Sequence, residues 1–224
     1  MSRDPDSSPD AVSEAPASRS VLQVRSEEAF LADEMQAARA GTWAFLAQVL
    51  RSAPDEALLD TLRALRDIDT GEGPIAMGWE LLRRAAGQTD ERAVADEYFA
   101  LFIGLGRGEL VPFGSWYLTG FLMEKPLALL RRDLARLGIE REAGVAESED
   151  HAAALAETMA ILIRAGEDVP LTEQRSFFKD HLSAWMPRFF QDMQSAERAG
   201  FYRSVGFFGE AVLTFEAALL DMPD

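Results

Sequence analysis

The spacing of large apolar residues is the feature that most constrains how this chain folds. Near the C-terminus, large apolar side chains recur at alternating intervals of three and four residues, at Val205, Phe208, Val212, Phe215 and Leu219. This interval places side chains on one face of an α-helix. Similar patterns recur along most of the chain, and no stretch alternates apolar and polar residues between hairpin turns. We therefore predict an all-α fold without a sheet.

Prolines, glycines and capping residues divide this pattern into about nine to ten helices. Pro54 ends a helix that buries Trp43, and Asp55 and Asp90 are placed to cap the helices that follow them. Loops are predicted at 71–74, 104–112 and 139–149. The later helices are predicted to begin near Ser115 and Lys125 and to span 150–166, 172–185, 187–199 and 201–220.

The composition changes near residue 26. Residues 1–26 are rich in Ser, Asp, Pro and Ala and offer little to bury, which predicts a disordered tail. Residues 27–224 are then expected to form a single globular helical domain. The N-terminus has no apolar segment typical of a secretory signal, and no run of apolar residues is long enough to span a membrane. We therefore expect a cytoplasmic protein.

The charge and the amino-acid usage exclude several classes of function. With 22 Lys and Arg against 38 Asp and Glu, the net charge is −16, which disfavours nucleic acid and anionic lipid and suits a basic partner. The chain has no cysteine, so disulfides, thiolate metal sites and cysteine nucleophiles are absent. Its two histidines are His151 and His181, so a metal site would depend on carboxylates.

The glycine-rich sequence Gly104–Gly108 allows three interpretations. A dinucleotide-binding loop requires a preceding strand and a helix opening at its last glycine, whereas here a helix precedes and Pro112 follows. The segment can instead be a flexible connector, or a loop whose backbone approaches a ligand closely.

Ser115, Asp150, His151 and Glu157 carry the chemistry that a catalytic hypothesis would need. Ser115, His151 and Asp150 could form a nucleophilic set, and His151 with Asp150 or Glu157 could hold a metal. The structural alternative makes Ser115 a cap of the helix after Pro112 and Asp150 the cap of the next long helix. Three acids, Glu147, Glu149 and Asp150, also suit a helix N-terminus. A further alternative is a binding site, in which Phe113, Trp116 and Tyr117 are partly exposed aromatics.

Three blocks of the chain resemble the TorD/DmsD/NarJ group of redox-enzyme maturation chaperones. The first comprises 96–104 (DEYFALFIG) with 111–118 (VPFGSWYL), and the second is 147–151 (ESEDH) with Glu157 and Met159 downstream. The third is 178–185 (FKDHLSAW), with Phe201 and Tyr202 opening the last helix. Two positions depart from the family pattern: Ser148 replaces a usual proline, and Leu155 stands where many members have Glu.

The resemblance implies a TorD-like helical fold without enzymatic activity. It also implies binding of the leader, usually a twin-arginine signal peptide, and of the apo form of the catalytic subunit of a molybdopterin-dependent oxidoreductase. The resemblance further implies that the chain assists cofactor insertion and delays export, with the molybdenum cofactor belonging to the client. The residues expected to bind the leader are Leu101, Phe102, Gly104, Pro112, Phe113, Ser115, Trp116, Tyr117, Glu147, Asp150 and His151.

Other features remain open at the level of sequence. No cofactor of the chain's own is expected, although weak guanine-nucleotide binding is associated with the family, as are domain-swapped dimers beside monomers. The alternative functions are a small helical metal-dependent hydrolase using Asp150, His151 and Glu157, and a structural subunit of a larger complex.

Overall fold

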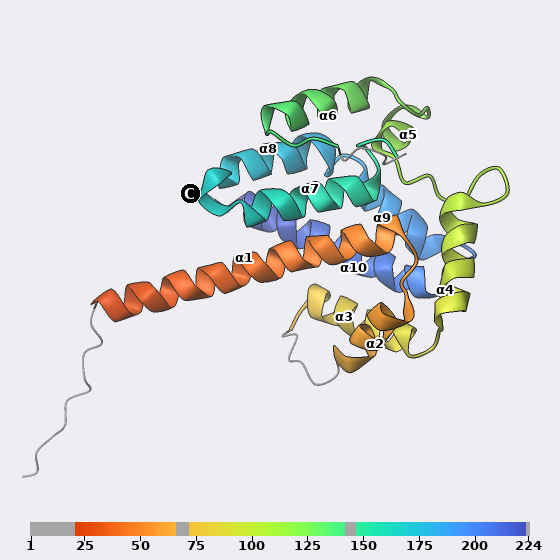
Figure 1. Cartoon of the computed structure of the whole chain (residues 1–224), viewed down its shortest axis with the longest axis horizontal. Coiled ribbons are helices and arrows are strands. Elements are labelled where there is room, and N and C mark those ends of the chain that lie inside the picture. Colours follow the sequence, from red (N-terminus) through yellow and green to blue (C-terminus); the bar gives the residue numbers. More distant parts are fainter. Residues whose placement is uncertain (1–20, 66–71, 142–146, 223–224) are drawn as a thin grey trace, which may run out of the picture. The chain divides into compact units, whose positions relative to one another are not determined.

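The computed structural model describes residues 21–65, 72–141 and 147–222, which form α-helices joined by loops (Figure 1). The helices are α1 Val21–Arg51, α2 Glu56–Ala64, α3 Pro74–Ala86, α4 Glu91–Tyr98, α5 Gly114–Thr119, α6 Lys125–Arg136, α7 Ala152–Arg164, α8 Leu171–His181, α9 Met186–Ser195 and α10 Phe201–Leu220. A π-helical segment, Phe99–Ile103, continues α4, and a 3-10 turn, Gly166–Asp168, follows α7. These ranges contain no β-strand beyond one isolated bridge, so the predicted all-α fold is confirmed.

The chain divides into two compact units, residues 1–35 and 36–224, and α1 crosses the boundary between them. Because α1 begins at Val21, residues 21–26 are helical although the sequence assigns them to the tail. Residues 1–20 lie outside the described residues, so the disordered tail and the domain boundary at residue 26 stay predictions. Of the helices that the structure describes, none is both long and apolar enough to cross a bilayer.

The helix boundaries set by local capping are confirmed. The side chain of Asp55 accepts a hydrogen bond from the backbone N–H of Leu58 at 2.8 Å, and Asp90 accepts one from Ala93 at 2.8 Å. Each bond satisfies a donor that the first turn of a helix leaves unpaired. The predicted breaks at 71–74 and 139–149 fall partly on residues 71 and 142–146, which lie outside the described residues.

Two helix ends differ from the prediction. The helix expected over 172–185 ends at His181, where the indole N–H of Trp185 donates to the His181 carbonyl at 2.8 Å. In a continued helix the backbone N–H of Trp185 would donate to this carbonyl. Here the indole N–H of Trp185 takes its place. The helix expected to reach Ala199 ends at Ser195.

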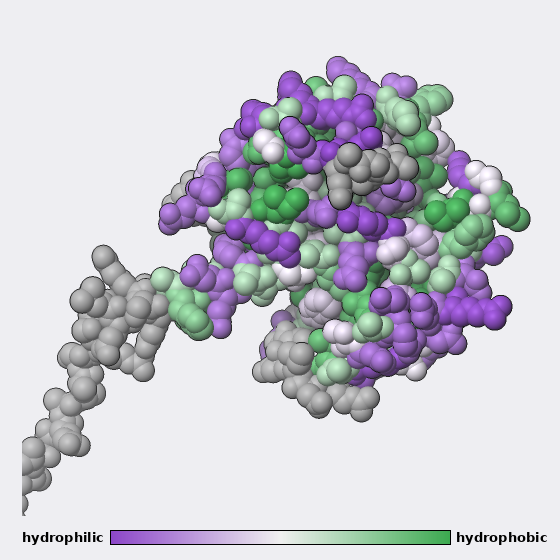
Figure 2. Space-filling model, in the orientation of Figure 1, coloured by the Kyte–Doolittle hydropathy of each residue, from purple (hydrophilic) through white to green (hydrophobic). Residues whose placement is uncertain are grey.

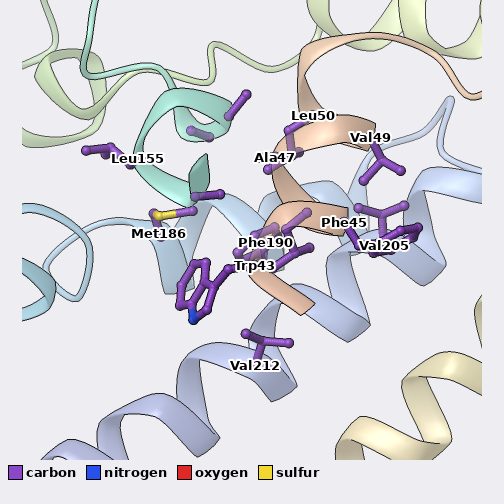
Figure 3. Packing of buried hydrophobic residues seen from close by; sticks show 14 of the residues in the cluster. Trp43, Phe45, Ala47, Val49, Leu50, Leu155, Met186, Phe190, Val205 and Val212 are labelled. Carbon is purple, nitrogen blue, oxygen red and sulfur yellow. The ribbon is translucent and has the colours of Figure 1, made fainter. Parts of the chain in front are cut away.

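The core of residues 36–224 lies where α10 packs against α9, α3 and the second half of α1. Figure 3 shows Trp43 and Phe45 of α1 close to Phe190 of α9 and to residues of α10. Gly209 permits this approach, because a β-carbon there would lie 2.3 Å from the Phe190 ring. An alanine at this position would therefore require the Phe190 ring to shift.

A buried polar cluster fastens α1 to α8 and α10. The guanidinium of Arg39 pairs with Glu216, and it also donates to Gln174 Oε1 at 2.8 Å. The indole N–H of Trp43 donates to Glu216 Oε2 at 3.1 Å. All the charges in the cluster are paired and hydrogen-bonded, which is the condition under which a buried ion pair is tolerated.

Candidate functional site

Two of the sequence blocks meet in a short backbone pairing, which we call the motif junction and define as residues 112–115 with 148–152. The carbonyl of Pro112 accepts from the N–H of Ala152 at 2.8 Å, and the N–H of Gly114 donates to the carbonyl of Asp150 at 2.9 Å. Phe113 and His151 thereby form an isolated antiparallel bridge. The pairing joins the start of α5 to the start of α7, so the two helices are positioned by one element.

Asp150 binds inside the junction and is not the cap of α7. Its side chain is buried; Oδ2 accepts from the backbone N–H of Ser115 at 2.8 Å, and Oδ1 accepts from Ser148 Oγ at 2.5 Å. The carboxylate therefore lies at the N-terminus of α5, where it meets the positive end of that helix. The predicted capping of α7 by Asp150 is wrong, because the backbone pairing turns its side chain toward α5.

His151 performs the capping that was assigned to Asp150. Its Nδ1 accepts from the N–H of Ala153 at 3.1 Å, in the first turn of α7. The ring is buried with its centroid 4.9 Å from that of Phe113. Burial lowers the pKa of His151 to about 4, so the imidazole is neutral at pH 7. A neutral ring with an acceptor at Nδ1 carries its proton on Nε2.

Ser115 does not cap a helix, which corrects the second capping prediction. Phe113 occupies the N-cap position of α5, and its side chain makes no capping hydrogen bond. The Ser115 hydroxyl is fully buried and has no hydrogen-bond partner in the structure. The backbone N–H of Ser115, rather than its hydroxyl, contacts Asp150.

The geometry does not assemble the catalytic alternatives. His151 Nδ1 is committed to a backbone N–H, and Ser115 Oγ is not bonded to it. Glu157 is exposed on α7 and pairs with Arg51 of α1. Within the described ranges, no three His, Asp or Glu side chains form a group that could hold a metal ion.

The predicted residues before the junction fall into the core and a glycine loop. Leu101 is fully buried, and the ring of Phe102 packs against Tyr98 and Tyr202 with centroids 5.0 and 5.2 Å apart. Gly104 ends the π-helical segment at a φ of 63°, a conformation that favours glycine. Because a helical segment and not a strand precedes the loop, the dinucleotide-binding interpretation lacks its structural context.

A pocket of about 360 Å³ lies between this loop, α5 and α9. Its lining includes Arg107, Glu109, Trp116, Tyr117 and Asp192. The hydroxyl of Tyr117 donates to Asp192 Oδ2 at 3.1 Å. Burial, with the Asp192 carboxylate close by, raises the pKa of Tyr117 well above its ordinary value, so the phenol stays protonated. The pocket therefore combines an aromatic wall with carboxylates.

An exposed apolar surface begins in the last turn of α5, and we define it as Leu118, Phe121, Leu122 and Met123. The exposed fractions of Phe121 and Met123 are 69% and 77%. Figure 2 shows hydrophobic colouring over the connection between α5 and α6. The sequence prediction missed these residues and named Glu147, which is exposed on another loop. The signal for them was a run of large apolar residues between Gly120 and Pro126, outside any helical period.

A family model agrees with the resemblance drawn from the sequence blocks. The model described as nitrate reductase delta subunit matches residues 71–191, more than half of the chain. The chain belongs to this family. The match includes the whole motif junction and the exposed apolar surface, which confirms the resemblance to the TorD/DmsD/NarJ group.

Curated relatives of this nitrate reductase delta subunit family member are named chaperone protein TorD. The protein from Vibrio parahaemolyticus is 24% identical over 137 residues, which are 56% of this chain and 64% of the relative. The protein from Aliivibrio fischeri is 27% identical with the same coverage, and that from Vibrio cholerae is 26% identical over 152 residues, 63% of this chain and 69% of the relative. The matched region thus spans about two thirds of the length of these relatives.

A solved structure shares the helical fold of this family member. It is a protein described as a redox enzyme maturation protein, from Archaeoglobus fulgidus. The TM-score is 0.50 with 22% sequence identity, and the match covers 79% of this chain and 92% of the other. At this level of identity the likeness supports the fold alone.

Proposed function

We propose that this chain is a maturation chaperone that binds the N-terminal leader of the catalytic subunit of a molybdopterin-dependent oxidoreductase. The membership of the nitrate reductase delta subunit family and the TorD relatives support this proposal. In this role the chain holds the apo form of its client in the cytoplasm while the molybdenum cofactor is inserted. The chain contributes binding energy and delays export, and it catalyses no reaction.

The observation that carries the proposal is the exposed apolar surface beside the motif junction. Contiguous exposed apolar residues on a protein mark interaction sites, because their burial by a partner is favourable. Here the surface begins in the last turn of α5, the short helix whose first turn is fixed by the Asp150 carboxylate. The junction thus provides a rigid base for side chains that contact the client.

The charge of the chain complements a twin-arginine leader. Such a leader is basic at one end and apolar after it, whereas this chain carries a net charge of −16. The pocket that contains Glu109 and Asp192 is lined by Trp116 of α5, the helix that precedes the apolar surface. Carboxylates pair strongly with guanidinium groups when both are partly shielded from water. The basic part of a leader can therefore contact the pocket while its apolar part covers the surface.

The test is co-expression with the catalytic subunit of a molybdopterin oxidoreductase from the same organism, with its leader intact or deleted. We expect the intact client to co-purify with the chain and the leader-deleted client to do so several-fold less. Light scattering on the complex measures its stoichiometry and decides between a monomeric and a dimeric chaperone. The molybdenum content of the client, measured with and without the chain, reports cofactor insertion.

Two results would contradict the proposal. One is equal recovery of the intact and leader-deleted clients, which would remove the leader from the interaction. The other is full molybdenum loading of the client in cells that lack the chain. In the same assay Phe121→Ser tests the apolar surface, and Phe215→Ser, which changes an exposed phenylalanine on α10, is its control for nonspecific loss of apolar surface.

A further inference from the structure

A guanidinium group of the chain itself stacks on an aromatic wall of the pocket beside α5. The terminal carbon of Arg107 lies over the ring of Trp116, 4.9 Å from its centroid. Both residues line the pocket together with Glu109 and Asp192. Within the described residues Arg107 forms no ion pair. The guanidinium of Arg107 is therefore held by its stacking on the indole of Trp116.

The loop that carries Arg107 is held at its two ends by backbone hydrogen bonds. Gly104 donates to the carbonyl of Phe99 at 2.7 Å, and Leu110 donates to that of Leu101 at 2.8 Å. Gly108 is packed so closely that a β-carbon there would lie 2.4 Å from the Leu101 carbonyl oxygen. Between these anchors Leu105 has an exposed fraction of 99%. The tip of the loop, residues 105–107, is therefore exposed to solvent while its ends are held in place.

The walls of the pocket suit a guanidinium better than an ammonium group. A guanidinium is flat and weakly hydrated, so it stacks on an aromatic face and donates to carboxylates in its plane. Trp116 supplies the face. Asp192 accepts from Tyr117 and from Arg188 Nε at 2.7 Å. A carboxylate offers about four acceptor positions, so Asp192 retains capacity for another donor.

We propose that Arg107 is an internal occupant of a guanidinium-binding pocket and that an arginine of the client's leader displaces it from Trp116. This inference rests on the proposed function for the source of the arginine. Arg107 then acts as an autoinhibitory plug, because its guanidinium must first leave the face of Trp116. The pocket selects arginine over lysine, and Arg107 sets how tightly a leader must bind to enter.

Calorimetric titration of the full chain with synthetic leader peptides tests this inference. One peptide carries the two arginines and a matched peptide carries lysines in their place. The variants are Arg107→Gln, which removes the plug, and Asp192→Asn, which keeps an acceptor for Tyr117 while removing the charge. Arg84→Gln is the control, because it removes the same charge from an exposed arginine on α3.

The two variants should change affinity in opposite directions. Arg107→Gln should raise the affinity for the arginine peptide about two- to fivefold relative to Arg84→Gln, the effect of removing an exposed cation–π competitor. Its effect on the lysine peptide should equal that of Arg84→Gln. Asp192→Asn should lower the affinity for the arginine peptide more than for the lysine peptide.

Failure of the pocket and failure of the proposed function give different results. If both peptides bind equally well to every variant, leader binding stands and the arginine pocket is refuted. If neither peptide binds any variant, the proposed function is contradicted. A small probe then tests whether the pocket binds a guanidinium group. N-acetyl-arginine amide should shift the indole N–H resonance of Trp116 in NMR spectra more than N-acetyl-lysine amide does, and more in Arg107→Gln than in the native chain. Equal shifts would overturn the inference.

Discussion

The motif junction and the exposed apolar surface lie next to each other along α5 but differ in how their side chains are used. In the junction Asp150 and His151 are buried, and their side chains bond to groups of the chain itself. On the apolar surface Phe121 and Met123 are mostly exposed. Asp150 and His151, which carry reactive groups, therefore stabilise the fold. Phe121 and Met123, which carry none, are exposed and can contact a partner.

This difference shows that the Asp150-His151 pair can have a structural role and need not be catalytic. The carboxylate of Asp150 fixes the start of α5, and the imidazole of His151 fixes the start of α7. Both interactions satisfy backbone donors at helix ends. We interpret the pair as the support that orients the apolar surface, and the following predictions test that division of roles.

Asp150→Ala should cause the largest loss of stability. The substitution removes the acceptor for the Ser115 N–H and for the Ser148 hydroxyl inside a buried junction. Leaving buried donors without partners should lower the free energy of unfolding by about 2–4 kcal/mol. Denaturant unfolding followed by circular dichroism measures the change.

Ser115→Ala is the matched control for this prediction, because it changes a neighbouring residue of the same junction. Its buried hydroxyl has no partner in the structure, so its removal should leave the free energy of unfolding unchanged or raise it. If Ser115→Ala were as destabilising as Asp150→Ala, the hydrogen bonds assigned to Asp150 would not be what holds the junction.

The pH dependence of stability should report on His151. Its pKa is lowered to about 4 by burial, below the ordinary value of 6.5, so the unfolded chain binds a proton first as the pH falls. Between pH 6.5 and 4.5 this difference should cost about 2 kcal/mol of stability, which is present above pH 6.5 and lost toward pH 4.

His151→Asn isolates that contribution from the titration of the carboxylates. Asparagine is a good N-cap and does not titrate, so the variant should lose less stability than the native chain over the same pH interval. Parallel thermal or denaturant melts of the two proteins give the difference. Identical pH profiles would show that folding does not lower the pKa of His151.

Local rules predicted much of the fold from the sequence. Asp55 and Asp90 cap helices whose bonded N–H groups lie three residues away, so their role is visible in the sequence itself. The last helix follows its apolar spacing and has the predicted bounds. Such features depend on neighbours along the chain, and their prediction needs no knowledge of the tertiary structure.

The site was harder to predict because its contacts are distant in sequence. Asp150 looked like a cap for the helix that follows it, yet its partner is Ser115, which is 35 positions away. The pairing that joins the two segments has no signature in either one alone. The apolar surface was missed for a different reason. Large apolar residues are expected in a core, and only the structure shows that Phe121 is exposed.

The smallest expected effect on folding belongs to the apolar surface, and it tests the central claim most directly. Phe121→Ser changes an exposed side chain, so the free energy of unfolding should change by less than about 0.5 kcal/mol. Calorimetric titration with a twin-arginine leader peptide should nevertheless show binding weakened by about 1–2 kcal/mol, roughly five- to thirtyfold. Phe215→Ser should bind the peptide as the native chain does. Equal affinities for all three proteins would contradict the assignment of leader binding to this surface.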